Sequence, residues 1–236
     1  MIEEIQKLDH EEHKELSPFI SDAIIGLSDG LTVPFAIAAG LATAAASNGN
    51  IIIAAVIAEI TAGSISMGLG GYLAANTEAK HYENERIREE REVEEKPEVE
   101  KQEVALIFEQ FGLSKNESTG VAESLSKNKK TWVDFMMKFE LGLEEPDKRQ
   151  ALKSGITIGG AYIVGGLIPL TPYLFLRHHV TLAFEYSIVA TLIALVIFGY
   201  IRGRLIAQKP FAGIVQTVLL GAIAATAAFL LGRLVS

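Results

Sequence analysis

Five long apolar blocks constrain the fold of this chain more than any other feature of its sequence. A helix needs roughly 20 mostly apolar residues to cross the hydrocarbon core of a bilayer, and each block reaches or nearly reaches that length. The sequence therefore predicts an all-α, polytopic membrane protein with five transmembrane helices. The blocks lie at about residues 20–46, 51–75, 156–176, 182–200 and 211–234.

A polar region, residues 76–150, separates the second block from the third. The second block continues into this region without Gly or Pro until Pro97, which indicates one long helix that leaves the membrane. Because proline lacks a backbone N–H and disfavours helix at the preceding residue, the helix should break at Lys96. The rest of the region is predicted to form a small helical domain, inserted between transmembrane helices two and three.

Three further helices are expected in this inserted domain. The first runs from about residue 98 to 111 and ends at Gly112, since glycine is common just past a helix end. Ser114 is predicted to cap the second helix and Thr131 the third, which should stop at Gly142. The whole chain then divides into an N-terminal segment, two transmembrane helices, the inserted domain and three transmembrane helices. The predicted limits of these segments are 1–19, 20–76, 77–150 and 151–236.

The placement of lysine and arginine predicts the orientation in the membrane. The connection between the fourth and fifth blocks, RGRLIAQK, contains Arg202, Arg204 and Lys209. Positive charges in short loops favour the cytoplasmic side, and with five spans this connection shares its side with the N-terminus and the inserted domain. Both are therefore expected in the cytoplasm. The acidic start of the chain lacks the basic region of a cleavable signal, so the first helix is expected to direct insertion.

The composition excludes several classes of function. The chain has no cysteine, which excludes disulfides, thiolate metal sites and thiol redox chemistry. Its formal charge is −8 and it has no basic stripe, which argues against nucleic-acid binding. A ferritin-like di-iron oxidase would need Glu-x-x-His pairs on bundle helices, and His81 is the only histidine of the inserted domain. We therefore expect a protein that is not an enzyme.

Two acidic residues and a methionine in the first two spans are the candidate functional groups. Asp29 and Glu59 are expected near mid-bilayer, where a charged side chain costs roughly 2.5–3.5 kcal/mol and is a functional-site hypothesis by default. Met67, two helical turns beyond Glu59, adds a thioether, and this ligand set suits Fe²⁺ or Mn²⁺ better than Ca²⁺. Carboxylates that release metal when protonated would couple metal to protons. The alternative is a structural, protonated carboxyl bonded between helices.

Further acidic and methionine side chains are weaker candidates. Glu185 lies near the start of the fourth span, where an interfacial or exit role is possible. The inserted domain carries two i, i+3 glutamate pairs, one on each side of Pro97, and a Met-Met pair with a nearby glutamate. From spacing alone, a solvated glutamate face and core packing of the methionines are the favoured interpretations. These domain residues are Glu89, Glu92, Glu100, Glu103, Met136, Met137 and Glu140.

Four stretches of the chain resemble one known family. They are DAIIGLSDGLTVPFA, AEITAGSISMGLGGYLA, HYENERIREEREVEEKPEVEKQEV and WVDFMMKFELGLEEPDKRQAL. Together they resemble the vacuolar iron transporter family, and more closely its plant-type members with a cytoplasmic metal-binding domain. The resemblance covers the chain from about Phe19 to the C-terminus. It implies five spans per protomer, a homodimer, and export of Fe²⁺ from the cytosol in exchange for protons.

The resemblance also implies roles for the candidate residues. Asp29, Glu59 and Met67 match the translocation path. Fe²⁺ is then both substrate and domain-bound ion, with Mn²⁺, Co²⁺ and Zn²⁺ left open as further ions. The membrane is vacuolar in a eukaryote, or the cell membrane in a prokaryote. The residues that match the metal ligands of the domain are Glu89, Glu92, Glu100, Glu103, Met136, Met137 and Glu140.

Two functions remain in competition at this point. The first is an Fe²⁺/H⁺ antiporter that moves ferrous iron from the cytosol into a vacuole-like compartment. The second is a membrane-anchored metal sensor or buffer without transport, although an anchor has no use for paired acids at mid-bilayer. For the antiporter we expect a twofold dimer with the first span against its mate, in which Gly26 and Gly30 allow close contact and the path residues of both copies surround one axis.

Overall fold

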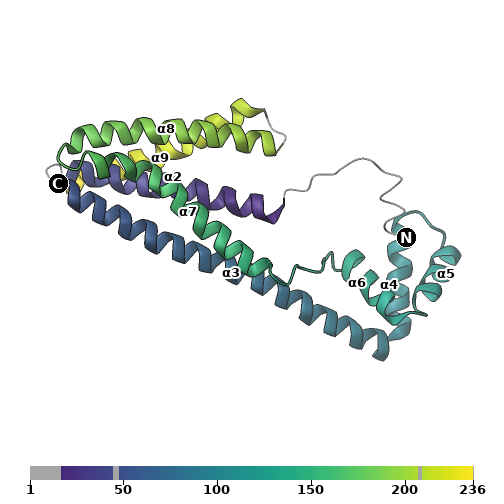
Figure 1. Cartoon of the computed structure of the whole chain (residues 1–236). Helices are drawn as coiled ribbons and strands as arrows, with labels where there is room; N and C mark the ends of the chain where they lie inside the picture. The colour runs from purple at the N-terminus through teal and green to yellow at the C-terminus, as the bar shows by residue number, and fades with distance from the viewer. Residues whose placement is uncertain (1–16, 45–47, 207–208, 236) are drawn as a thin grey trace. The chain divides into compact units, whose positions relative to one another are not determined.

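The computed structural model describes residues 17–44, 48–206 and 209–235. Within this part of the chain all regular structure is helical, and five helices are long and apolar enough to cross a membrane, which confirms the predicted fold class. Most of the predicted N-terminal segment lies outside the described residues. The helices (Figure 1) are α2 (Pro18–Ala44), α3 (Gly49–Glu95), α4 (Pro97–Gln110), α5 (Lys115–Leu125), α6 (Lys129–Phe139), α7 (Gln150–Phe175), α8 (Val180–Leu205) and α9 (Pro210–Val235).

The chain forms two compact units. The first, Met1–Tyr72 with Leu152–Ser236, contains α2, α7, α8, α9 and the first part of α3. The second, Leu73–Ala151, contains the rest of α3 with α4, α5 and α6. Helix α3 is continuous through both, as the absence of Gly and Pro between residues 76 and 96 predicted.

The first unit is held together by close helix crossings at small residues. A Cβ atom added at Gly165 of α7 would lie 2.9 Å from backbone atoms of Gly30 and Leu31 in α2. One added at Gly155 of α7 would lie 2.9 Å from the carbonyl oxygen of Gly68 in α3. Glycine at such crossings lets two helix backbones touch without intervening side chains. Helix α7 therefore packs directly against both α2 and α3.

The structure corrects the expected role of two glycines in α2. Gly26 and Gly30 were predicted to form the contact between two copies of the chain, but both face α7 of the same chain. A Cβ at Gly26 would meet Ala161, and a Cβ at Gly30 would meet the backbone of Tyr162. The physical reason is that the small residues of α7 offer these glycines a partner within the protomer. They are thus already used in folding.

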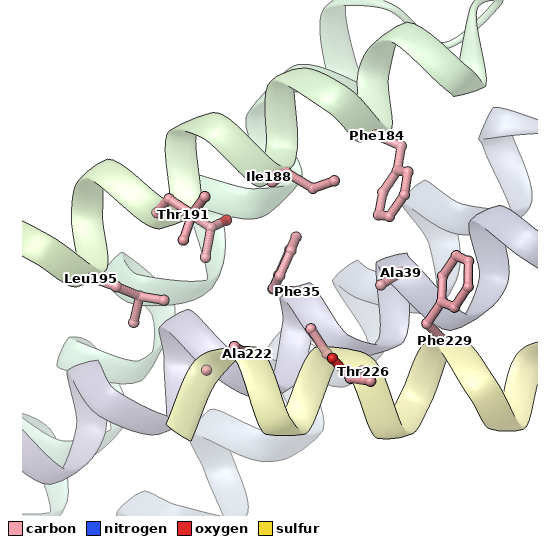
Figure 2. Close-up of a pocket in the computed structure, with 12 residues that line it drawn as sticks. Phe35, Ala39, Phe184, Ile188, Thr191, Leu195, Ala222, Thr226 and Phe229 are labelled. Atoms are coloured by element: carbon pink, nitrogen blue, oxygen red, sulfur yellow. The ribbon is translucent and has the colours of Figure 1, made fainter. Parts of the chain in front are cut away.

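Helices α8 and α9 pack against α2 and against each other. Between the three helices lies an apolar cavity of about 320 Å³, shown in Figure 2. Phe35, Phe184 and Phe229 line it, one from each helix. The buried hydroxyl of Thr191 also borders the cavity and has no hydrogen-bond partner among the described residues. The cavity holds no titratable side chain, so it is not a candidate for metal or proton chemistry.

The second unit surrounds a small hydrophobic core. Its buried members include Val93, Val104, Trp132, Met136 and Met137, which come from α3, α4 and α6. Both methionine side chains are almost completely buried, with exposed fractions of 0% and 1%. A thioether packs readily into an irregular core. In the metal-free structure, therefore, the two methionines serve as core residues.

The predicted helix ends of the second unit are confirmed with one exception. Helix α3 ends before Lys96, which is the N-cap of α4, and Ser114 is the N-cap of α5. Gly112 and Gly142 follow α4 and α6 with φ angles of +96° and +65°, in the left-handed region that favours glycine.

Thr131 is not the cap of α6, as had been predicted. The helix begins at Lys129, and the side chain of Asn128 accepts a hydrogen bond of 3.2 Å from the backbone N–H of Thr131. Asparagine is among the preferred N-cap residues, and its side chain satisfies an amide in the first helical turn. Thr131 therefore supplies the amide that is capped, and the helix starts three residues earlier than a cap at Thr131 implies.

Candidate functional site

A tyrosine lies near both candidate acids of the first unit. The hydroxyl of Tyr162 in α7 donates a hydrogen bond to Oε1 of Glu59 in α3. The carboxylate of Asp29 in α2 lies near enough to interact electrostatically with the same tyrosine. Both acids are half-buried, whereas Tyr162 is only 2% exposed. Three helices thus bring two carboxylates to one phenol within the apolar part of the chain.

Local sequence explains how Tyr162 reaches Glu59. Gly63 lies one helical turn after Glu59, and a Cβ added there would lie 2.6 Å from the tyrosine hydroxyl. Gly30, next to Asp29, lets the backbone of α7 approach α2 at the level of Tyr162. A larger residue at Gly63 would push the tyrosine ring away, and one at Gly30 would push the backbone of α7 away. The glycines around the acids therefore create the space that the tyrosine occupies.

One carboxylate oxygen at this site has no hydrogen bond. Oε2 of Glu59 is buried and lacks a partner among the described residues, although Oε1 is bonded to Tyr162. A buried polar atom without a partner costs free energy and calls for an explanation. A bound cation or a proton would satisfy this oxygen. The carboxyl of Glu59 is therefore the best-defined ligand of the candidate site.

The other predicted residues of the first unit lie at different levels. Met67 is half-buried and follows Glu59 by eight residues on α3, about 12 Å along the helix axis at 1.5 Å per residue. Asp22 accepts a hydrogen bond of 2.6 Å from Ser154. Glu185, the weaker candidate, is exposed in the second turn of α8. The structure thus brings Asp29 and Glu59 to one tyrosine, while Met67 lies further along the same helix as Glu59.

The second unit contains a group of three carboxylates, here called the carboxylate cluster. Its members are Glu89 of α3, Glu100 of α4 and Glu140 at the end of α6, and one oxygen from each lies within 4.8 Å of the others. Glu89 and Glu100 are buried, and Oε2 of each has no hydrogen-bond partner among the described residues. Two buried carboxylates, each with one oxygen that lacks a donor, lie beside a third, and a divalent cation would satisfy this set.

The electrostatics of the cluster show how crowded these acids are. The pKa of Glu100 is raised to about 7, first because its carboxyl is removed from water and then because Glu103 and Glu89 repel a charge there. The pKa of Glu140 is also raised to about 7 by desolvation of its carboxyl and by Glu103, although the residue as a whole is exposed. Glu92 adds further negative charge to both positions. Burial and mutual repulsion therefore favour the protonated forms of Glu100 and Glu140.

The predicted ligands of the domain therefore separate into three groups. Glu89, Glu100 and Glu140 form the cluster, Glu92 and Glu103 act on it electrostatically, and Met136 and Met137 pack in the core directly before Glu140. The solvated-face interpretation does not describe Glu89 and Glu100, because both side chains are buried. Spacing alone gave no sign of this burial, since it depends on how α4 and α6 pack on α3.

Comparison with known proteins decides the family. Residues 20–233 match the model of the VIT family. The chain belongs to the VIT family. This match covers all five long apolar helices as well as the second unit. The family resemblance inferred from the four sequence stretches is thereby confirmed.

The relatives in this family include plant and fungal proteins. Vacuolar iron transporter 1 of Arabidopsis thaliana is 50% identical over 230 residues, which are 97% of this chain and 91% of the relative. Vacuolar iron transporter 1 of Tulipa gesneriana is 50% identical over 228 residues, 96% of this chain and 92% of the relative. Protein CCC1 of Saccharomyces cerevisiae is 38% identical over 224 residues, 91% of this chain and 68% of the relative.

Tyr162 is the residue of the candidate site that sequence reasoning missed. It stands in the glycine-rich stretch GGAYIVGG of the third span, which was not singled out in the sequence analysis. A usable signal was present, because a buried tyrosine hydroxyl usually finds a hydrogen-bond partner. In an apolar span the available partners are few, and the acids of the neighbouring spans are among them.

Proposed function

We propose that this protein is a proton-coupled Fe²⁺ transporter that moves ferrous iron out of the cytosol by Fe²⁺/H⁺ antiport. The single observation that carries the proposal is the pair Asp29 and Glu59 near one tyrosine, in helices long enough to span a membrane. Glu59 accepts a hydrogen bond from Tyr162, and Asp29 acts on the same tyrosine electrostatically. The names of the relatives, which are vacuolar iron transporters, support iron as the substrate and the vacuolar membrane as the location. Mn²⁺ is a second substrate to test.

In this proposal Asp29, Glu59 and Met67 form the translocation path. Carboxylate oxygens bind Fe²⁺ only when they are deprotonated, so iron and protons compete for the same groups. Fe²⁺ arriving from the cytosol displaces protons, and an acidic compartment on the far side returns them and releases the metal. The free oxygen of Glu59 supports this role, since it is available to either cation. No nucleotide is required, because the proton gradient supplies the driving force.

The second unit is proposed to be a cytoplasmic domain that collects metal for the path. The carboxylate cluster would bind Fe²⁺ at the entrance with modest affinity, and the neighbouring Glu92 and Glu103 would raise the local cation concentration. Met136 and Met137 would contribute as ligands only after rearrangement, since both are packed in the core. Ala substitutions at Glu100 and Glu103 should therefore lower the metal bound per protein and slow transport without abolishing it.

We also propose a homodimer that places two copies of the path around one axis. Few acids are available in one protomer, and a second copy would supply Asp29, Glu59 and Met67 again. Since Gly26 and Gly30 face α7, the contact between protomers would use other positions of α2, such as the exposed Ile25 and Val33. A monomer that transports at the full rate would contradict a shared path.

The decisive experiment measures Fe²⁺ uptake into liposomes that contain the purified protein and have an acidic interior. Uptake should follow the pH gradient and stop when an ionophore collapses it. Uptake that is indifferent to the gradient would exclude antiport. The competing function, a membrane-anchored metal buffer, is favoured only by the carboxylate cluster, and it predicts metal binding with no uptake under any gradient.

A further inference from the structure

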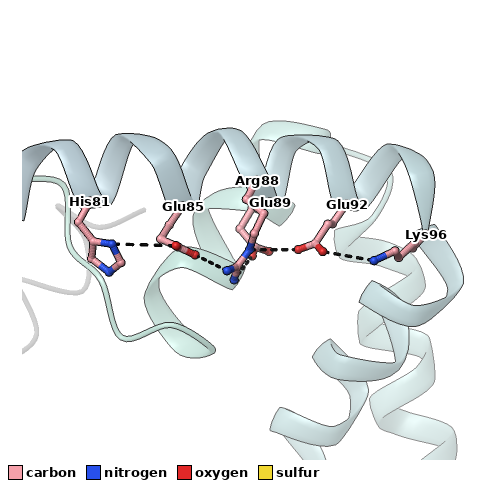
Figure 3. A network of polar contacts seen from close by, with 6 residues as sticks. All are labelled: His81, Glu85, Arg88, Glu89, Glu92 and Lys96. Atoms are coloured by element: carbon pink, nitrogen blue, oxygen red, sulfur yellow. Dashed lines mark hydrogen bonds and ion pairs between the residues drawn. The ribbon is translucent and has the colours of Figure 1, made fainter.

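One arginine lies directly against the candidate ligands of the second unit. The guanidinium of Arg88 contacts three glutamates on α3, shown in Figure 3. Its Nη1 lies 2.8 Å from Oε2 of Glu85, its Nη2 3.5 Å from Oε1 of Glu89, and its Nε 3.3 Å from Oε2 of Glu92. Two of these three partners are candidate metal ligands, and Glu85 is not.

The charge of Arg88 is permanent, because an arginine side chain is not deprotonated in proteins. It lies beside a buried glutamate whose second oxygen has no partner among the described residues. Lys96 also contacts Glu92, at 3.4 Å, but it is more exposed and touches no member of the carboxylate cluster in the described structure. Arg88 is therefore the cation that acts on Glu89.

We infer that Arg88 is a built-in counter-cation that limits the affinity of the carboxylate cluster for divalent metal. A divalent ion entering between Glu89, Glu100 and Glu140 must share Glu89 with the guanidinium and meets its positive charge. The shortest of the three contacts, to Glu85, lets Arg88 stay paired while Glu89 and Glu92 turn toward the metal. A site that loads metal only to pass it on needs such a limit, so this inference rests on the proposed collecting role of the cluster.

The opposite role for Arg88 makes the opposite prediction. A partner that orients a ligating carboxylate usually strengthens metal binding, and its loss weakens binding by about 10–100-fold. The distances argue against that role, because the contact of Arg88 with Glu89 is the longest of the three and leaves Oε2 unpaired. The sign of the change in metal affinity therefore separates a competing cation from an orienting one.

The test measures Fe²⁺ binding to the full-length protein in detergent, without oxygen and at fixed pH and ionic strength. Arg88→Gln should lower the Kd on the order of tenfold, the effect of one charge about 6 Å from a divalent ion in a water-like dielectric. Arg88→Lys keeps the charge and should bind nearly as the wild type does. Lys129→Gln is the matched control, since it removes one positive charge from the same unit but pairs with Glu94, which is not a candidate ligand.

A second measurement guards against a folding defect. Without metal, Arg88→Gln should melt at a lower temperature than the wild type. Saturating Fe²⁺ should then raise the melting temperature of the variant by more than it raises that of the wild type. If that variant does not fold, Glu85→Gln tests the same inference. Without Glu85 as a partner, Arg88 should bind Glu89 and Glu92 more firmly. Fe²⁺ binding should therefore become weaker. Glu90→Gln is the control, because it also removes one negative charge from α3 but at a residue that pairs with Arg86. It should change the Kd for Fe²⁺ less than Glu85→Gln does.

Two results would overturn the inference. An unchanged or higher Kd for Fe²⁺ in Arg88→Gln would exclude competition between Arg88 and the metal. Equal weakening of Fe²⁺ binding in Arg88→Gln and Arg88→Lys would assign Arg88 an orienting role. Failure of the proposed collecting role looks different, because Fe²⁺ binding would then survive replacement of Glu100 and Glu140 by Gln. If binding depends on those two glutamates and is indifferent to Arg88, only the present inference fails.

Discussion

The hydroxyl of Tyr162 donates a hydrogen bond to Glu59, a residue 103 positions earlier in the chain. This contact joins α7 to α3 at the level where Asp29 of α2 also acts on the tyrosine. Tyr162 has no charge of its own, and in the proposed mechanism it holds one oxygen of Glu59 while the other remains available to metal or proton. In that proposal Tyr162 is a positioning residue for the translocation path.

Tyr162→Phe tests this role with the loss of a single oxygen atom. Fe²⁺ uptake should fall by roughly an order of magnitude, since a hydrogen bond to an ionised group contributes about 1.5–3 kcal/mol. The matched control is Tyr173→Phe on the same helix, because the hydroxyl of Tyr173 is buried and has no partner among the described residues. Equal uptake by both variants would show that the Tyr162 hydroxyl does not matter.

Asp29→Asn and Glu59→Gln should fold but lose transport. Each change keeps the shape of the side chain and removes the carboxylate that, in the proposed mechanism, exchanges metal for protons. Fe²⁺ uptake into liposomes and the melting temperature in detergent are the two measurements. Glu185→Gln, a change at an exposed carboxylate in α8, is expected to leave uptake near the wild-type rate. Wild-type uptake by Asp29→Asn would exclude Asp29 from the path.

The stability of the metal-free second unit should depend on pH in a defined direction. The pKa values of Glu100 and Glu140 are raised from 4.5 to about 7, so the folded state binds more protons than the unfolded state between these values. Stability is therefore highest below about pH 4.5 for these two groups and is lost as the pH rises through 7. Hydrogen exchange of α4 and α6, measured without metal from pH 5 to 8, should show faster opening at the higher pH.

Glu100→Gln should flatten this pH dependence, because glutamine is neutral throughout the range. Its matched control is Glu98→Gln, a change on the same helix at an exposed residue that pairs with Lys101. Fe²⁺ should remove the dependence in the wild type, since a bound cation stabilises the ionised carboxylates. An opening rate that is independent of pH in the metal-free wild type would contradict the crowding of these acids.

A methyl group added at the crossing of α7 and α2 should destabilise the first unit. Gly165→Ala forces Cβ to within 3.0 Å of three backbone atoms of α2, and overpacking of this kind typically costs about 1–3 kcal/mol. Gly160→Ala, on the same helix, is the control because an added Cβ there has open space. Thermal unfolding in detergent should show a lower melting temperature for Gly165→Ala and an unchanged one for Gly160→Ala.

Much of the fold follows from the sequence because the bilayer leaves few choices. Apolar block length predicted five spans, and Pro97 predicted the end of α3, since both depend on local chemistry. Thr131 was assigned the wrong role because Asn128 and Thr131 are both good caps, and only the structure shows which one precedes the first helical turn. Gly26 and Gly30 were assigned to the wrong contact because a glycine face does not reveal its partner.

The candidate site was less accessible to sequence reasoning than the fold. Asp29 and Glu59 stand out because charge is rare in an apolar span, whereas Tyr162 looks like ordinary packing until its hydroxyl is seen beside Glu59. Spacing showed that pairs of glutamates share a helix face. It did not show which of them are buried, because the burial of Glu89 and Glu100 depends on the packing of three helices.

The contacts of α7 with its neighbours have a mechanical consequence. Backbone touches backbone where Gly165 meets Gly30 and where Gly155 meets Gly68, so no flexible side chain is present to absorb a shift. Any slide or rotation of α7 must be followed by α2 and α3, the helices that hold Asp29 and Glu59. We therefore expect Asp29 and Glu59 to move together whenever α7 moves, rather than independently of each other.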